Sequence, residues 1–437
     1  MGRSEVATRP RVRWTGWRVT AVLVCVGLAF TVVVLQPTGR TVATRADLDL
    51  LATMSPSEAA VYLEEHPQLR AEAMNADPST TAHWWRDLSE AERRRALRSS
   101  PEMVGNLDGV EYETRDTANR RFLDRLIDRA KRALEARPGD ENATHRLAAL
   151  TAILKAADAK HSPPRHLVTL FDESPPLAAI VVGDLDEAEQ VTYNVPGMGT
   201  YTDDMQLWTL SAQNLREHQL TVGSPTTSAV VAWINYRTPP PGVDATLGEY
   251  ASQGAPRLAR DILGLQATRA HDPVDTVNIV AHSYGTTTAA DALADEDLGV
   301  HAFVMLGSAG IEQDIPGASA LSAERVYAGE ASADPEARFG RFSRTDPRSP
   351  AFGALVIDVD GSEDEGLLPV TGHEPILHSQ WNDDPMSKAW TKYEDPVVAA
   401  EKYFEHQQTF GYLDNGTESL LNTAIATTRA PTRRFVH

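Results

Sequence analysis

The chain has 437 residues, of which 42% are hydrophobic, so it can bury a core of its own as one large domain or two ordinary ones. Its formal net charge of −20 argues against a nucleic-acid-binding protein, because such proteins usually carry a basic patch or stripe. Cys25 is the single cysteine, which excludes an intramolecular disulfide, a cysteine-based zinc site and a dithiol redox centre.

An apolar run at residues 19–35 follows five arginines, and Trp14 and Trp17 stand where aromatic residues border a membrane. This pattern predicts that residues 1–40 are a cytoplasmic basic tail and an uncleaved transmembrane signal-anchor. The rest of the chain is then extracytoplasmic and attached to the cell membrane by a single span. The alternative is a secreted protein, if the signal is cleaved.

Residues 41–164 have a helical pattern. Ser55 with Glu58, and Ser89 with Glu92, have the spacing of reciprocal helix caps, and apolar residues recur every three or four positions at 122–134. No convergent set of titratable groups appears in this region. We therefore expect a helical region that packs on or covers a catalytic core.

Residues 165–437 have the pattern of an α/β catalytic domain. Short apolar runs alternate with helical stretches, which is typical of a mostly parallel sheet with helices on both faces. The predicted strands are 166–171, 177–182, 190–195, 228–235, 276–281, 301–306, 325–328 and 354–359, and the predicted helices are 203–218, 247–264 and 286–294.

Ser283 is the candidate nucleophile. It follows the predicted strand 276–281 by one histidine and precedes a predicted helix, which is the setting of a nucleophile elbow. The strained turn requires small residues two positions away on each side, and Ala281 and Gly285 meet that requirement.

Two backbone N–H groups are candidates for an oxyanion hole, which stabilises the negative oxygen of a tetrahedral intermediate. Tyr284 directly follows the nucleophile, and Met198 lies in the turn Val-Pro-Gly-Met-Gly-Thr that ends the predicted strand 190–195. Gly197 and Gly199 allow the backbone of this turn to approach a ligand closely.

The acid of a catalytic triad is expected after the nucleophile, at the end of a following strand. Asp334 fits this position, because it lies just past the predicted strand 325–328. The rival carboxylates come later in the chain and are Asp346, Asp358 and Asp360.

The base is expected to be a histidine beyond the strand 354–359. His373 is preferred because it follows Gly372 in a turn-rich segment, while His378 is the alternative and His406 lies in a helix-like run. No metal-ligand spacing or phosphate-binding glycine loop is recognisable, so neither a metal nor a cofactor is expected.

Several motifs together resemble one family, the α/β-hydrolase family found mostly in high-GC Gram-positive bacteria and long catalogued as a domain of unknown function. The resemblance covers residues 84–428. Its motifs are Trp84-Trp85-x-x-Leu88, Pro101-Glu-Met-Val-Gly-Asn-Leu-Asp-Gly109, Arg115-Asp116 with Asn119, Val195-Pro-Gly-Met-Gly199, Ala-His-Ser-Tyr-Gly285, Thr345-Asp-Pro-x-x-x-Ala-Phe-Gly353 and Gly411-Tyr-Leu-Asp-x-Gly-Thr-Glu-Ser-Leu-x-Asn422.

The resemblance implies an α/β-hydrolase fold, a nucleophile at Ser283, an acid at Asp334, and a helical segment that belongs to the same unit as the sheet. It implies no particular substrate. The chain departs from the family in two places. Ala281 stands where the family usually has glycine, and a long stretch separates His373 from Tyr412, which lie close together in many relatives.

These residues predict a serine hydrolase that cleaves or transfers an acyl ester through a Ser-Asp-His triad and an acyl-enzyme. The expected partner is a small-molecule or lipid-like ester, with no nucleic acid. A serine peptidase with the same triad is one alternative, because an elbow does not distinguish esters from amides. A catalytically silent cell-surface binding module is another.

We predict that a chain beginning at Thr41 is folded and soluble, because residues 19–35 are a tether outside the catalytic core. Cell fractionation of the full-length and shortened chains checks this prediction. Full-length protein free in the cytosol, or a shortened chain that aggregates under all conditions, would contradict the anchor.

Overall fold

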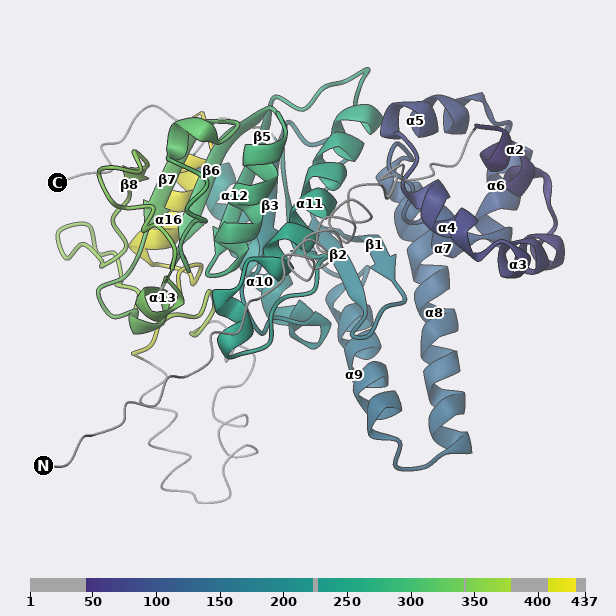
Figure 1. Ribbon diagram of the computed structural model, residues 1–437, viewed down its shortest axis with the longest axis horizontal. Coiled ribbons are helices and arrows are strands. Elements are labelled where there is room, and N and C mark those ends of the chain that lie inside the picture. Colours follow the sequence, from purple (N-terminus) through teal and green to yellow (C-terminus); the bar gives the residue numbers. More distant parts are fainter. Residues whose placement is uncertain (1–44, 223–226, 342, 379–407, 430–437) are drawn as a thin grey trace, which may run out of the picture. The chain divides into compact units, whose positions relative to one another are not determined.

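The structure is a computed structural model that describes residues 45–222, 227–341, 343–378 and 408–429 (Figure 1). These residues belong to one compact unit, Val42–His437. None of the helices in these ranges is long and apolar enough to cross a membrane. The predicted anchor at 19–35 and the candidate His406 lie outside the described residues.

Among the described residues, eight strands form one sheet in the order β1-β2-β4-β3-β5-β6-β7-β8. β2 pairs antiparallel with β1 and with β4, and all the other pairs are parallel. The predicted α/β architecture is therefore confirmed. The strands are β1 Arg165–Phe171, β2 Leu177–Val182, β3 Gln190–Val195, β4 Ser228–Ile234, β5 Thr276–His282, β6 Val300–Leu306, β7 Ala323–Gly329 and β8 Leu355–Val356.

The predicted strand 354–359 is wrong in its length, because only Leu355–Val356 pair with β7 as a strand. The N–H of Ile357 still donates to the carbonyl of Ala328. Two residues later, however, the carbonyl of Val359 accepts from the N–H of Val370, in a following loop. The apolar run is buried there by a loop rather than by sheet pairing.

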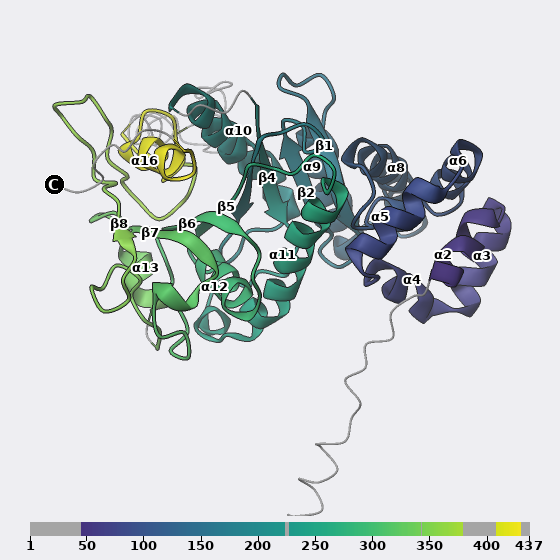
Figure 2. The ribbon, with the colours of Figure 1, turned by 90° about the horizontal axis from the view of Figure 1, so that it is seen from above.

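Helices cover both faces of the sheet (Figure 2). Neighbouring residues of the central strands belong to different apolar cores: Ile279 of β5 packs in the core with α11 and α12, and Val280 packs in the core with α10 and α16. This alternation is what a doubly covered parallel sheet requires. The covering helices are α10 Met205–Val222, α11 Glu249–Thr268, α12 Gly285–Asp295 and α16 Glu418–Ala426, and a short helix α13 Pro335–Gly340 follows β7.

The region before the sheet is helical, as predicted. Ser55 and Ser89 each form the expected capping box, with Glu58 and Glu92 respectively. A separate apolar cluster contains the buried Trp84 and Trp85. The helices are α2 Arg45–Thr53, α3 Pro56–Glu65, α4 Pro67–Met74, α5 Pro78–Asp87, α6 Glu90–Ser99, α7 Pro101–Val104, α8 Tyr112–Ala136 and α9 Glu141–Ala156.

Side chains of this helical region satisfy the outer edge of β1, the first strand of the sheet. Asn106 donates to the carbonyl of Leu170 and accepts from its N–H, at 2.8 and 2.9 Å. The N–H of Leu167 donates to Asp116 at 2.6 Å, and its carbonyl accepts from Asn119 at 3.1 Å. The family motifs quoted above therefore include residues that protect an exposed strand edge from pairing with another chain.

We predict that Asn106→Ala lowers the free energy of unfolding by roughly 2–3 kcal/mol, because it leaves a buried N–H and a buried carbonyl of Leu170 without their partner. Denaturant unfolding measures the change. Asn142→Ala is the control: it removes the same amide from an exposed position on α9 and should change stability by less than about 0.5 kcal/mol. Equal losses for the two variants would contradict the edge-protection account.

Candidate active site

Ser283 lies between the end of β5 and the start of α12, and its backbone has a φ of 53°. Residues other than glycine rarely adopt this left-handed conformation, which must be enforced by the surrounding structure. The N–H of Ser283 donates to the carbonyl of Leu306 in the neighbouring strand at 3.0 Å. Sheet pairing thus continues into the turn and fixes the serine at the carboxyl ends of the parallel strands.

Two glycines allow this turn to pack tightly. A Cβ added at Gly285 would lie 2.5 Å from the carbonyl oxygen of Pro196, and one added at Gly197 would lie 2.5 Å from the Cβ of Ser283. Both distances are too short for any side chain. The turn after β3 and the turn after β5 therefore press against each other, which brings Met198 beside the serine.

Ser283, His373 and Asp334 form a continuous hydrogen-bonded chain. Ser283 Oγ lies 2.8 Å from Nε2 of His373. Nδ1 of the same ring lies 2.8 Å from Oδ2 and 3.0 Å from Oδ1 of Asp334. Since a carboxylate can only accept, Nδ1 carries the proton in the neutral ring, and Nε2 is free to accept the serine proton.

The pKa values of this pair are shifted in opposite directions. Burial lowers the pKa of His373, but its hydrogen bond to Asp334 and the negative charge of that carboxylate outweigh burial and raise the pKa above its usual value. For Asp334, burial raises the pKa, but the hydrogen bond and charge of His373 dominate and lower it to about 2. Asp334 is therefore ionised at neutral pH.

His282, which directly precedes the serine, supports the His373 loop. Its Nε2 lies 2.6 Å from the backbone carbonyl of His373, so this nitrogen must carry the proton that it donates. Burial, followed by the nearby His373, lowers the pKa of His282 to about 3. The ring therefore stays neutral over the ordinary pH range.

The structure gives the alternative base and the rival acids contacts elsewhere. His378 stacks on Phe410, with ring centroids 4.7 Å apart. Asp346 bonds to Arg348, and Asp360 accepts from the backbone N–H of Ser332. The backbone carbonyl of Asp358 accepts from the side chain of Asn422.

The long stretch between His373 and Tyr412 does not separate them in space. The N–H of Tyr412 donates to the carbonyl of Glu374 at 3.2 Å, and the N–H of Leu413 donates to that of Pro375 at 2.8 Å. Asp414 accepts from the N–H groups of Leu377, His378 and Gly411, each at 2.7 Å. In many relatives these two segments lie close together in the sequence. In this chain they are far apart in the sequence, and hydrogen bonds bring them together.

A pocket of about 270 Å³ opens at the serine. Its lining includes Ser283, His373 and both residues proposed for the oxyanion hole, Tyr284 and Met198. A second pocket, of about 380 Å³, shares Met198 and Glu336 with the first, and its lining also contains Asp204 and Glu374. The nucleophile and base candidates therefore face a space that can admit a small molecule.

Part of the chain is similar to a known family. Residues 172–343 match the family model described as "Alpha/beta hydrolase". This segment contains the strands β2–β7, Ser283 and Asp334. This part of the chain has the α/β-hydrolase fold.

The chain is 30% identical to two uncharacterized proteins of Mycobacterium tuberculosis, from strains CDC 1551 and H37Rv, over 338 residues. The matched region is 65% of this chain and 51% of each relative, so the chain spans about half the length of these relatives.

Solved structures similar to this chain include an arylesterase, with 12% identity, 53% of this chain and 87% of that chain covered, and a TM-score of 0.31. Another is the dienelactone hydrolase of Anabaena variabilis, with 16% identity, 45% and 87% coverage, and a TM-score of 0.28. A third is a serine hydrolase without a lid from Xanthomonas campestris, with 18% identity, 45% and 80% coverage, and a TM-score of 0.25.

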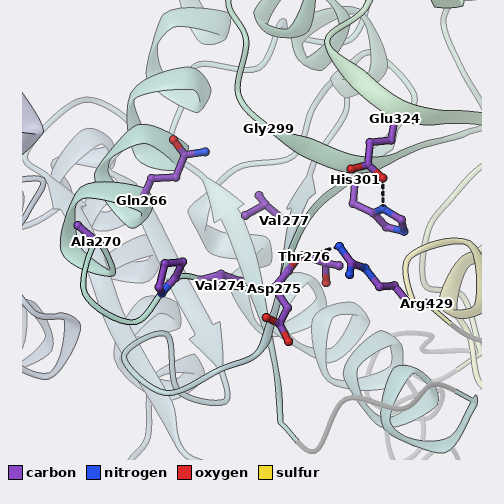
Figure 3. Close-up of a pocket in the computed structure, with 11 residues that line it drawn as sticks. Gln266, Ala270, Val274, Asp275, Thr276, Val277, Gly299, His301, Glu324 and Arg429 are labelled. Atoms are coloured by element: carbon purple, nitrogen blue, oxygen red, sulfur yellow. Dashed lines mark hydrogen bonds and ion pairs between the residues drawn. The ribbon is translucent and has the colours of Figure 1, made fainter.

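A further pocket, of about 150 Å³, lies at the end of the sheet opposite Ser283, where the parallel strands begin (Figure 3). None of its lining residues is a serine or a cysteine. Its histidine, His301, pairs instead with Glu324 at 2.7 Å, and Arg429 donates to the carbonyl of Asp275 at 3.3 Å. This pocket therefore has no counterpart of the pair formed by Ser283 and His373.

Sequence reasoning missed two side chains next to the candidate triad, His282 and Tyr412. Both belong to motifs quoted above, since His282 is in the elbow and Tyr412 is in the segment Gly-Tyr-Leu-Asp. Their presence in those motifs was the feature of the sequence that could have identified them as site residues. The contacts that they make depend on loops that the sequence does not place.

We predict that His373 titrates above the value of about 6.5 for an unperturbed histidine, whereas His282 remains neutral at pH 5. NMR titration of the intact protein with labelled histidines measures both. Asp334→Asn should lower the pKa of His373, because burial then acts without the opposing carboxylate. A His373 pKa that does not fall in this variant would contradict the pairing.

Proposed function

We propose that the protein is a serine esterase that forms an acyl-enzyme on Ser283, with His373 as general base and Asp334 orienting the imidazole. One observation carries the proposal. His373 lies 2.8 Å from Ser283 through one ring nitrogen and 2.8 Å from Asp334 through the other. A serine hydroxyl is a weak nucleophile unless a neutral imidazole takes its proton, and this geometry provides such an imidazole.

In the proposed reaction, Ser283 Oγ attacks the ester carbonyl carbon while its proton passes to Nε2 of His373. The carbonyl oxygen becomes negative and accepts hydrogen bonds from the N–H groups of Tyr284 and Met198. The C–O bond to the alcohol then breaks, and His373 gives its proton to the departing oxygen. Water, deprotonated by the same nitrogen, cleaves the acyl-serine and releases the acid.

The surroundings of the serine support a small-molecule substrate. The pockets of about 270 and 380 Å³ adjoin at Met198, so an ester bound at Ser283 in the first pocket can extend into the second. Asp334 keeps a negative charge next to His373, and this charge stabilises the imidazolium that forms during attack.

We also propose that the enzyme acts outside the cytoplasm, tethered to the cell membrane. The arginine-flanked apolar run at 19–35 supports this setting.

A fluorophosphonate probe tests the catalytic assignment. Ser283→Ala should abolish covalent labelling, and His373→Ala should slow it by roughly three orders of magnitude or more. Asp334→Asn should slow it without unfolding the chain, because the imidazole loses the group that fixes its tautomer. His378→Ala is the matched control and should label at nearly the normal rate.

Labelling that persists in Ser283→Ala would overturn the proposal, and labelling lost in His378→Ala but kept in His373→Ala would overturn the choice of base. Turnover of a p-nitrophenyl ester beside the matching p-nitroanilide tests the substrate class. Faster cleavage of the anilide than of the ester would favour a peptidase instead.

A further inference from the structure

Tyr412 contacts the triad through Asp334. Its hydroxyl lies 2.8 Å from Oδ2 of Asp334, and it accepts from the backbone N–H of Ala331 at 3.0 Å. Tyr412 and Asp334 are both fully buried. Since the N–H of Ala331 already donates to this hydroxyl, the phenolic proton is directed at the carboxylate.

Asp334 therefore accepts from three donors. These are Nδ1 of His373, the hydroxyl of Tyr412, and the backbone N–H of Ala337, for which Asp334 is also the N-cap of α13. Burial, followed by the charge of Asp334, raises the pKa of Tyr412, so it keeps its proton and remains a donor at any ordinary pH.

The backbone of Tyr412 bonds to the loop that carries His373. Its N–H donates to the carbonyl of Glu374, the residue after His373, at 3.2 Å. The same residue thus contacts the acid through its hydroxyl and the base-bearing loop through its backbone.

We infer that Tyr412 is a positioning residue of the triad: its hydroxyl fixes the orientation of Asp334 and offsets part of its negative charge. This inference rests on the proposed function. Without the hydroxyl, less of the Asp334 charge is offset, so the protonated form of His373 becomes more stable. The pKa of His373 then rises. As the pH falls, the imidazole is therefore protonated, and stops acting as a base, at a higher pH than in the unsubstituted chain.

The other charged and titratable groups around this pair do not change in such a variant. Glu336 of α13 and Glu374 lie near His373, and Glu330 and Arg348 lie near Tyr412. His282 stays neutral. A shift in the pH dependence would therefore report the lost hydroxyl.

The test is the rate of fluorophosphonate labelling as a function of pH in the full chain. Tyr412→Phe should slow labelling at the plateau by roughly two- to tenfold and move the acid midpoint upward by roughly a few tenths of a pH unit. Tyr193→Phe is the matched control: it removes another buried hydroxyl, which donates to the carbonyl of Asp261 at 3.0 Å, and it should leave the midpoint unchanged.

A second variant separates positioning from a general loss of stability. If Tyr412 acts through Asp334, then Tyr412→Phe added to Asp334→Asn should slow labelling less than twofold further. An unchanged or lowered midpoint in Tyr412→Phe, or a full additional loss in the double variant, would overturn the inference. No labelling of the unsubstituted chain would instead overturn the proposed function itself.

Discussion

The tight reversal of the chain at Ser283 is the constraint on which the site depends. A serine with a φ of 53° is stable only where its neighbours leave it no other conformation. The sheet provides this restraint through the bond from Ser283 N–H to Leu306, and the turn after β3 provides it through contact at Gly197 and Gly285. Because the reversal is held in this way, the hydroxyl points to His373, and two candidate oxyanion donors lie nearby.

The same sheet needs protection at its far edge, and the helical region provides it. Side chains of α8 and of the loop before it bond to backbone groups of β1 that would otherwise face solvent or another chain. Arg115 adds a bond to the carbonyl of Val168 at 2.9 Å. This dependence explains why the family motifs extend into a region that holds none of the proposed catalytic residues.

The sequence predicted the fold well because periodicity and turn residues are local signals. The strands 177–182 and 190–195 have the predicted ends, since clear turn signals bound each apolar run. Ser283 and Asp334 were identifiable because each follows such a strand. The choice among histidines was not local: it depends on Asp414, whose carboxylate joins the His373 loop to the segment at Gly411 across an intervening stretch. Tyr412 was missed for the same reason, and residues 357–359 were predicted as strand because burial by a loop gives the same apolar pattern.

The most direct test of the central claim is to trap the acyl-enzyme. The full chain is mixed with an activated p-nitrophenyl ester and quenched in acid within milliseconds to seconds, and its intact mass and peptide map are recorded. We expect one added acyl group on the peptide that contains Ser283. This acyl group disappears as hydrolysis proceeds. Turnover of the ester with no acyl group on Ser283 at any time, or with an acyl group on another residue that forms and decays at the turnover rate, would contradict it.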